Sequence, residues 1–317
     1  MIICVSANPA LDRRLRLKSL KLGEIHRARQ SVAAAGGKAA HVAMVARSLN
    51  EPVLWIGLIG GAAGEHCRRE IVKLGIQTAK VETEGVTRSN LELIEEAACR
   101  NTEIREPGAP VSSGEAAAFF ECCREQVRRW PRSCVVLSGS LRPGTPIDFY
   151  RRMIEESRAC GSTVLLDAAG EAFSSALQAY PDVIKPNQAE ASEALEHQIG
   201  TLADAISAAR TLIERGARAV ALSLGSQGML WADHAFTSVL YGRSEPLQAV
   251  STVDCGDSML AGIAVGLSRG IRREEMVRLA VACGAANCYA EMPGMIECKR
   301  VETLMPSVVL TSCIDTA

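Results

Sequence analysis

Residues 134–170 read CVVLSGSLRPGTPIDFYRRMIEESRACGSTVLLDAAG, and their pattern decides the fold class. The apolar runs CVVLSGS and TVLLDAA have the length and β-branched content of buried strands. Between them, IDFYRRMIEESRAC carries apolar residues at helical spacing, with charged residues on the opposite face. This order predicts two parallel strands joined by a right-handed helical crossover.

The same alternation extends over most of the chain. Further buried strands are indicated by IICVSAN, VLWIGLIG, DVIKPN and AVALSLG, and further helices by EAAAFFECCREQVRRW and DAISAARTLIERG. Repeated strand–helix units predict an α/β fold, a three-layer α/β/α sandwich around a mostly parallel central sheet. The 48% hydrophobic content supplies a substantial core, and we expect residues 1–317 to form one domain.

Two stretches break this rhythm. Residues 12–34 and 79–106 alternate polar and apolar residues, as half-exposed strands do. They predict a small second sheet that acts as a lid over the carboxyl ends of the parallel strands and excludes water. Ordinary edge hairpins fit the pattern equally well. Because sheet edges and exposed apolar faces tend to be covered, a homodimer through the lid is one expectation.

Charge and cysteine usage narrow the class of partner. With 35 basic and 36 acidic residues the net charge is -1, which gives no bulk attraction for nucleic acid or an anionic membrane. Twelve cysteines lie scattered without CxxC pairs, which favours reduced thiols in a cytoplasmic protein over disulfides or zinc sites. No segment approaches the roughly 18 apolar residues of a membrane span. We therefore expect a small-molecule protein.

A carboxylate stands at the start of a predicted helix in STVDCGDSMLAG, residues 251–262. Asp257 caps the helix in the simplest interpretation, because its oxygens satisfy the free N–H groups of the first turn. In the alternative, these N–H groups hold an anion and the carboxylate is free to react.

Polar residues also gather where the predicted strands end. Ligands of open α/β sheets bind outside the carboxyl ends of the strands, so these residues predict one site. The set comprises Asn8, Asp12, Gly36, Gly37, Lys38, Ser138, Gly139, Asp167, Lys185, Asn187, Glu190, Gly225, Gly228 and Asp257.

The order of these motifs resembles the ribokinase-like carbohydrate kinases, in their phosphofructokinase B branch. The matching motifs are NPALD, GGKAAHVA, LIGGAAG, GVTRSN, TEIREPG, SGSLRPG, KPNQAE, SLGSQG, CGDSMLAG and CGAANC, which together span nearly the whole chain. Within the branch, NPALD and TEIREPG look like those of bacterial 1-phosphofructokinases and tagatose-6-phosphate kinases. The resemblance implies a ribokinase-like sandwich with a β-sheet lid. It also implies ATP, Mg²⁺ and a ketohexose phosphate substrate, fructose 1-phosphate or tagatose 6-phosphate.

The resemblance assigns roles to matching positions. Asp257 becomes the base that takes a proton from the sugar hydroxyl, beside an anion hole formed by Asp254, Cys255 and Gly256. The substrate-binding positions are Asp12, Gly36, Gly37, Lys38, His41, Arg88, Arg105 and Ser138. The nucleotide-binding positions are Lys185, Asn187, Ser223, Gly225, Gly228 and Asn287. Asn187 and Glu190 lie near Mg²⁺, partly through water.

Several of these residues also have an ordinary structural interpretation. Asp12 and Arg88 fit surface residues of strands, and Lys38 fits a solvated lysine at a helix start. Asn187 and Glu190 fit the first turn of a surface helix, and the glycines of SLGSQG fit a plain turn.

The chain departs from the family pattern at a few positions. Where the family has Gly-Ala-Gly-Asp, this chain has Asp254-Cys255-Gly256-Asp257, so Asp254 either adds a negative charge beside the anion hole or points into solvent. A thiol at a helix start predicts a lowered pKa for Cys255.

Other departures concern the substrate side. The family has Gly for Ala39, Asn for His41, Asn for Arg105 and Pro for Arg142. They keep three functions open: a kinase of a phosphosugar, a kinase of an unphosphorylated sugar, and a binding protein with attenuated catalysis.

Overall fold

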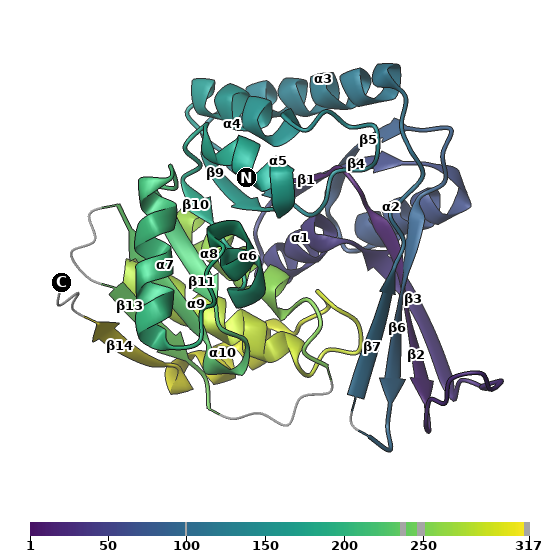
Figure 1. The fold of residues 1–317 in the computed structure, drawn as a ribbon. Helices are drawn as coiled ribbons and strands as arrows, with labels where there is room; N and C mark the ends of the chain where they lie inside the picture. The colour runs from purple at the N-terminus through teal and green to yellow at the C-terminus, as the bar shows by residue number, and fades with distance from the viewer. Residues whose placement is uncertain (99, 235–238, 246–250, 314–317) are drawn as a thin grey trace.

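The computed structural model describes residues 1–98, 100–234, 239–245 and 251–313, and its largest element is a ten-stranded sheet (Figure 1). The strand order is β14-β13-β12-β11-β10-β9-β8-β1-β4-β5. The parallel strands are β1 (Ile2–Ser6), β4 (Val53–Ile59), β5 (Gln77–Glu82), β8 (Cys134–Ser138), β9 (Thr163–Asp167), β10 (Val183–Ile184) and β11 (Ala219–Ser223). Three antiparallel strands extend one edge, β12 (Met229–Asp233), β13 (Val239–Arg243) and β14 (Val309–Cys313).

Helices cover both faces of this sheet, which makes the predicted three layers. Side chains of β1 alternate between the two cores: Ile2 and Cys4 belong to one, Ile3 and Val5 to the other. The first core is covered by α1 (Lys38–Ser48), α2 (Gly61–Lys73), α8 (Cys255–Arg269), α9 (Arg273–Asn287) and α10 (Cys298–Leu304). The second is covered by α3 (Ser113–Arg129), α4 (Phe149–Ala159), α5 (Gly170–Leu177), α6 (Gln188–Leu195) and α7 (Leu202–Glu214). Burial on both faces explains why these strands are continuous apolar runs.

A second sheet of four strands projects from the large one (Figure 1). Its order is β3-β2-β6-β7, with β2 and β6 parallel and the outer pairs antiparallel. The strands are β2 (Ala10–Leu17), β3 (Gln30–Gly36), β6 (Arg88–Glu95) and β7 (Arg100–Arg105). The predicted small sheet is therefore confirmed, and the alternative of two edge hairpins is wrong. We call these four strands the lid.

One boundary of the lid was predicted wrongly. Residues 79–82 belong to β5, which pairs with β4 at the edge of the large sheet, and the second lid segment begins at Arg88. An edge strand of the large sheet is half exposed, so its side chains alternate just as those of a lid strand do.

A buried ion pair fixes the lid to the rest of the molecule. Arg14 of β2 donates to Glu92 of β6 over 2.7 Å, and the two side chains are 3% and 9% exposed. Arg14 also donates to the carbonyls of Ala290 and Glu291, while Glu92 accepts from Ser251 over 2.7 Å. These contacts connect the lid to segments flanking α8 and α9.

The described part of the chain holds no helix that is both long and apolar enough to cross a membrane. All eleven cysteines in the described ranges are free thiols.

Candidate active site

Two cavities lie at the carboxyl ends of the central strands. The lid cavity, of about 310 Å³, is lined by Asp12, Arg13, Arg14, Gly37, Lys38, His41, Arg88, Asn90, Leu91, Glu92, Glu103, Arg105, Gly139, Ser140, Ala168, Ala169, Glu190, Val253, Asp254, Met292 and Pro293. The outer cavity, of about 490 Å³, is lined by Asn187, Ser223, Gly225, Ser226, Gly228, Ser244, Glu245, Thr252, Cys255, Gly256, Met259, Val281, Gly284, Ala285 and Cys288.

The start of α8 separates the two cavities. Asp254 lines the lid cavity, the next two residues line the outer cavity, and Asp257 follows with 2% of its surface exposed. Within the described ranges, the backbone N–H groups of Cys255 and Gly256 have no hydrogen-bond acceptor. Free N–H groups and the positive end of the helix dipole make this turn an anion-binding position.

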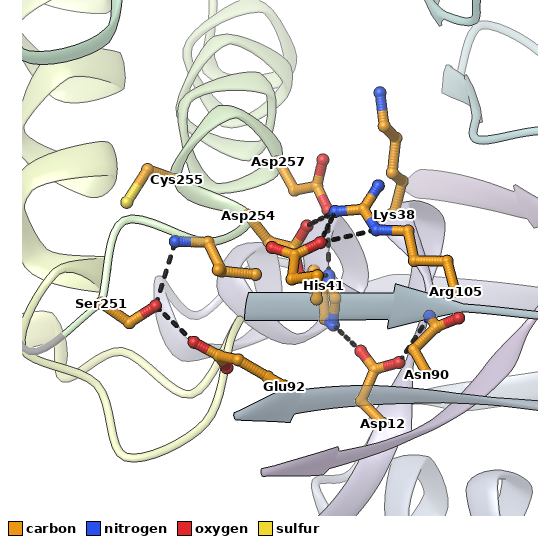
Figure 2. Close-up of polar contacts among 12 residues, drawn as sticks. Asp12, Lys38, His41, Asn90, Glu92, Arg105, Ser251, Asp254, Cys255 and Asp257 are labelled. Atoms are coloured by element: carbon orange, nitrogen blue, oxygen red, sulfur yellow. Dashed lines mark hydrogen bonds and ion pairs between the residues drawn. The ribbon is translucent and has the colours of Figure 1, made fainter. Parts of the chain in front are cut away.

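His41 of α1 joins the carboxylates around this turn (Figure 2). Its Nδ1 lies 2.9 Å from Oδ2 of Asp257 and its Nε2 lies 2.9 Å from Oδ2 of Asp12. Asp254 is a third neighbour, with Oδ2 at 3.5 Å from Nδ1. Burial alone would lower the pKa of His41, but Asp254 and the hydrogen bonds to Asp12 and Asp257 outweigh it and raise this pKa well above its ordinary value.

Asp254 does not point into solvent. Its side chain is 14% exposed, and Oδ1 lies 3.6 Å from Nη2 of Arg105. Burial raises the pKa of Asp254 to about 7, helped by Asp257 and Asp12 and opposed by His41 and Arg105. Its backbone is left-handed, with φ 56°, a conformation that favours glycine.

Asp12 lies at the floor of the lid cavity. Gly36 makes room for its carboxylate, because a Cβ at residue 36 would lie 2.0 Å from Cγ of Asp12. Gly37 starts α1 with φ 87°. Asn90 donates to Oδ1 of Asp12 over 2.8 Å. Sequence reasoning missed Asn90, although the motif GVTRSN ends on it and the lid register places it opposite Asp12.

Cations line the lid cavity on several sides. Lys38 is paired, with Nζ 2.7 Å from Oδ1 of Asp167 and 3.4 Å from Oε1 of Glu190. Arg88 donates to the carbonyls of Asn8 and Glu106, and burial lowers its pKa. The structure thus brings the predicted Lys38, Arg88 and Arg105 into one cavity.

Several predicted residues line neither cavity: besides Asn8, Gly36, Asp167 and Asp257, these are Lys185, Ser138 and Asn287. Lys185 is buried, pairs with Asp167 over 3.2 Å and lies behind Gly256, where a Cβ would approach Nζ of Lys185 to 3.0 Å. Ser138 is buried, and its Oγ has no partner within the described ranges. Asn287 donates to the carbonyl of Val253 and accepts from the N–H of Gly294, so it holds the loops beside the site.

Two residues at the start of α6 cap the helix and also line the cavities. Asn187 and Glu190 form a capping box, in which each side chain accepts from the backbone N–H of the other residue. Asn187 also lines the outer cavity and Glu190 the lid cavity. Ser223, Gly225 and Gly228 line the outer cavity together with Asn187, and all four were predicted as nucleotide-binding positions.

The structure corrects the lowered pKa expected for Cys255. Cys255 lies with its Sγ 3.5 Å from Sγ of Cys288, and this hydrogen bond, with burial, raises the pKa of Cys255 far above its ordinary value. The same contact lowers the pKa of Cys288. A position at a helix start would by itself lower the pKa of Cys255, but the neighbouring thiol of Cys288 has the larger effect and raises it.

Comparison with known sequences agrees with this arrangement. The model of the pfkB family carbohydrate kinases matches residues 6–295. The 1-phosphofructokinase of Bacillus subtilis (strain 168) is 30% identical over 314 residues, 98% of this chain and 99% of that protein. A 1-phosphofructokinase of Vibrio cholerae is 28% identical, over 99% of this chain and 98% of its own.

Solved structures agree as well. Phosphofructokinase-2 from Escherichia coli in complex with substrates and products has a TM-score of 0.88 at 28% identity, covering 96% of this chain and 98% of that chain. A tetrameric inhibited form of that enzyme has a TM-score of 0.86, with the same identity and coverage. Ribokinase from Arabidopsis thaliana, at 21% identity and with the same coverage of both chains, shares the fold with a TM-score of 0.74. The resemblance seen in the motifs and the ribokinase-like fold are thus confirmed, and this chain belongs to the pfkB family of carbohydrate kinases.

Proposed function

We propose that this kinase transfers the γ-phosphoryl group of ATP to a hydroxyl of a ketohexose phosphate in the cytoplasm, with fructose 1-phosphate as its main substrate. The observation that carries the proposal is the position of α8, whose first turn separates the lid cavity from the outer cavity. An acceptor on one side and a nucleotide on the other would meet at the free N–H groups of Cys255 and Gly256.

The lid cavity suits a sugar that already carries a phosphate. Asp12 and Asn90 offer an acceptor and a donor to sugar hydroxyls. Arg88 and Arg105 supply guanidinium groups, which bind phosphate through two parallel hydrogen bonds. Arg105 already pairs with Glu103 and Asp254, but Arg88 has no ion pair within the described ranges, so a substrate phosphate would supply its anion and the cavity favours a phosphosugar. The relatives called 1-phosphofructokinase support fructose 1-phosphate, and tagatose 6-phosphate is the second candidate.

The outer cavity suits the nucleotide. Its volume of about 490 Å³ lies within the range of small-molecule sites. Gly225 and Gly228 have φ of 60° and 100°, which favour glycine. A Cβ at Gly225 would meet no atom within 4 Å, whereas one at Gly228 would lie 2.1 Å from the carbonyl oxygen of Gly242. Asn187 and Ser223 add polar groups to the same wall.

Oxygen donors near the start of α6 fit magnesium. Asn187 and Glu190 present an amide and a carboxylate, but the capping box and Lys38 already engage them, so contact through water fits better than direct coordination. When bound there, Mg²⁺ would neutralise charge on the nucleotide phosphates.

Asp257 then acts on the sugar hydroxyl. Its carboxylate takes the hydroxyl proton as the oxygen–phosphorus bond forms and the bond to ADP breaks. This step contributes roughly 10²–10⁴ in rate. The N–H groups of Cys255 and Gly256 stabilise charge on the transferred group, and the lid keeps water away from it.

The test measures ADP release with Mg·ATP across fructose 1-phosphate, tagatose 6-phosphate, fructose 6-phosphate and unphosphorylated sugars. We expect turnover on a phosphosugar that falls roughly 10²–10⁴-fold in Asp257→Asn. Asp148→Asn is the matched control, because Asp148 also stands at a helix start, without capping it, and lines neither cavity. An inactive wild-type protein that still binds ATP would contradict the proposal and favour an attenuated binding protein.

A further inference from the structure

Three departures from the family pattern lie together in space. His41 is on α1, Arg105 is on β7 and Asp254 is at the start of α8. Asp254 contacts both of the others, with Oδ2 at 3.5 Å from His41 Nδ1 and Oδ1 at 3.6 Å from Arg105 Nη2. Figure 2 shows the three side chains converging on one point between the lid and α8.

The geometry of His41 favours a particular charge state while both neighbouring carboxylates are ionised. Both ring nitrogens lie 2.9 Å from carboxylate oxygens, of Asp257 and of Asp12. A neutral imidazole donates from one nitrogen only, so it would turn a lone pair toward the other carboxylate. A protonated imidazole donates to both. His41 is 2% exposed, and a mismatched polar contact at such a site is costly.

The charges facing His41 agree with this assignment. Asp12 faces it from β2, and Asp254 and Asp257 face it from α8. Arg105 of β7 reaches the group only through Asp254, and Lys38 on the helix of His41 pairs instead with Asp167 and Glu190. Three carboxylates thus surround one imidazole, and Asp254 adds the negative charge that favours a protonated ring.

We propose that His41 and Asp254 are a charge-matched pair of positioning residues. The protonated His41 holds the carboxylates of Asp12 and Asp257 in a fixed relation, and Asp254, held by Arg105, keeps the proton on His41. This inference rests on the proposed role of Asp257 as the base. It makes Asp254 a part of the working site instead of a defect in the anion hole.

The pair has a consequence for pH dependence. The pKa of His41 is raised, whereas burial, with Asp257 and Asp12, raises the pKa of Asp254 to about 7, so Asp254 carries its full negative charge only above that pH. As pH rises through the pKa of folded His41, the ring loses one of its two donors and releases a carboxylate. We expect kcat to fall there more than KM changes, because the base moves while the phosphate contacts of the substrate remain.

A double-mutant cycle tests the pair. His41→Asn and Asp254→Gly, each alone, should lower kcat roughly tenfold, since the first leaves three neighbouring carboxylates without their shared cation and the second weakens the hold on the proton of His41. Together they should restore most of the loss, because positions 41 and 254 then both match the family pattern, and the alkaline fall in kcat should be absent. A gain in turnover in Asp254→Gly alone, or losses that simply multiply in the double variant, would overturn the proposal.

A second readout does not depend on activity. Imidazole resonances are followed by NMR against pH, and His41 is assigned by the signal lost in His41→Asn. His197→Asn is the control, because His197 is exposed and lines neither cavity. We expect His41 to stay protonated well above the ordinary value of about 6.5, and to titrate lower in Asp254→Asn.

Titration of His41 at or below that ordinary value would overturn the pairing even in an active enzyme. Failure of the proposed function is distinguishable from failure of the pairing. It would appear as the absence of ADP release with every sugar tested, while His41 still titrated well above its ordinary value in the NMR experiment.

Discussion

At the scale of single residues, Arg142 shows a buried cation with a structural role. The residue is 2% exposed, and it donates to Oγ1 of Thr83 and to the carbonyls of Gly85 and Ala109. It lines neither cavity, and its hydrogen bonds go to loops. Arg142 instead fastens the loop before β6 to the loop before α3.

Removal of this side chain should destabilise the protein. Arg142→Ala leaves buried carbonyls without donors, so we expect the free energy of unfolding to fall by about 2–4 kcal/mol. Urea unfolding measures it. Arg272→Ala is the matched control, because its side chain is 82% exposed and should change stability by less than about 0.5 kcal/mol. Equal effects of the two substitutions would refute the structural role of Arg142.

Much of the candidate site could be predicted at this scale, because motif residues keep fixed places at strand and helix ends. The contacts between these residues could not be predicted from the sequence. His41 and Asp257 are 216 positions apart, and their hydrogen bond depends on how α1 and α8 pack. The thiol of Cys255 was predicted wrongly for the same reason, since Cys288 comes from the end of another helix.

At the scale of elements, two helices end in the same left-handed backbone conformation with different residues. Glu196 after α6 has φ 52° and Gly270 after α8 has φ 63°. Glycine adopts this conformation without steric cost, whereas a residue with a Cβ is strained by roughly 1–2 kcal/mol. The pair therefore offers opposite substitutions at equivalent positions.

We expect Glu196→Gly to stabilise the protein by about 0.5 kcal/mol, because the relieved strain exceeds the extra chain entropy of glycine. Gly270→Ala should destabilise it by about 1 kcal/mol. A Cβ at residue 270 would meet no atom within 4 Å, so the destabilisation would come only from the strain of a left-handed backbone. Thermal unfolding of both variants measures the difference, and shifts of the same sign would contradict the explanation.

The sequence predicted six of the seven parallel strands, but not β5 or the three antiparallel strands. The six predicted strands are buried on both faces and read as continuous apolar runs. The edge strand β14 is mostly exposed, so its residues carry little apolar pattern. Burial on one face only also caused the misplaced start of the lid, because β5 and a lid strand share the same alternation.

At the scale of the whole molecule, the lid carries apolar side chains that face solvent. Leu22 and Ile25, between β2 and β3, are 96% and 98% exposed, and Ile104 on β7 is 54% exposed. Exposed apolar groups on a projecting sheet are typical of a surface that another molecule covers. We therefore propose, as the sequence led us to expect, that two copies of this chain associate through their lids.

Leu22→Glu combined with Ile25→Glu should shift the protein from dimer to monomer, because charge replaces apolar contact area. Light scattering coupled to size exclusion measures the mass of each form. Ile147→Glu is the control, since Ile147 is 50% exposed but lies outside the lid. A wild-type protein that is monomeric, or a double variant that stays dimeric, would refute the lid contact.

The alternation of polar and apolar residues predicted the lid, but it did not predict which residues attach the lid to the rest of the molecule. The lid is fixed by Arg14 and Glu92, whose pairing joins β2 to β6 and reaches Ala290 and Ser251. Buried ion pairs of this kind join residues far apart in the chain, and neither partner looks buried in the sequence.

The three carboxylates around His41 also limit how this gene can change over generations. A lineage that lost the histidine first would carry three neighbouring buried aspartates without their shared cation. One that lost Asp254 first would weaken the hold on the proton while keeping the ring. If the proposed pairing holds, either intermediate would turn over more slowly than both ends of the route, and we would then expect the two codons to be exchanged together.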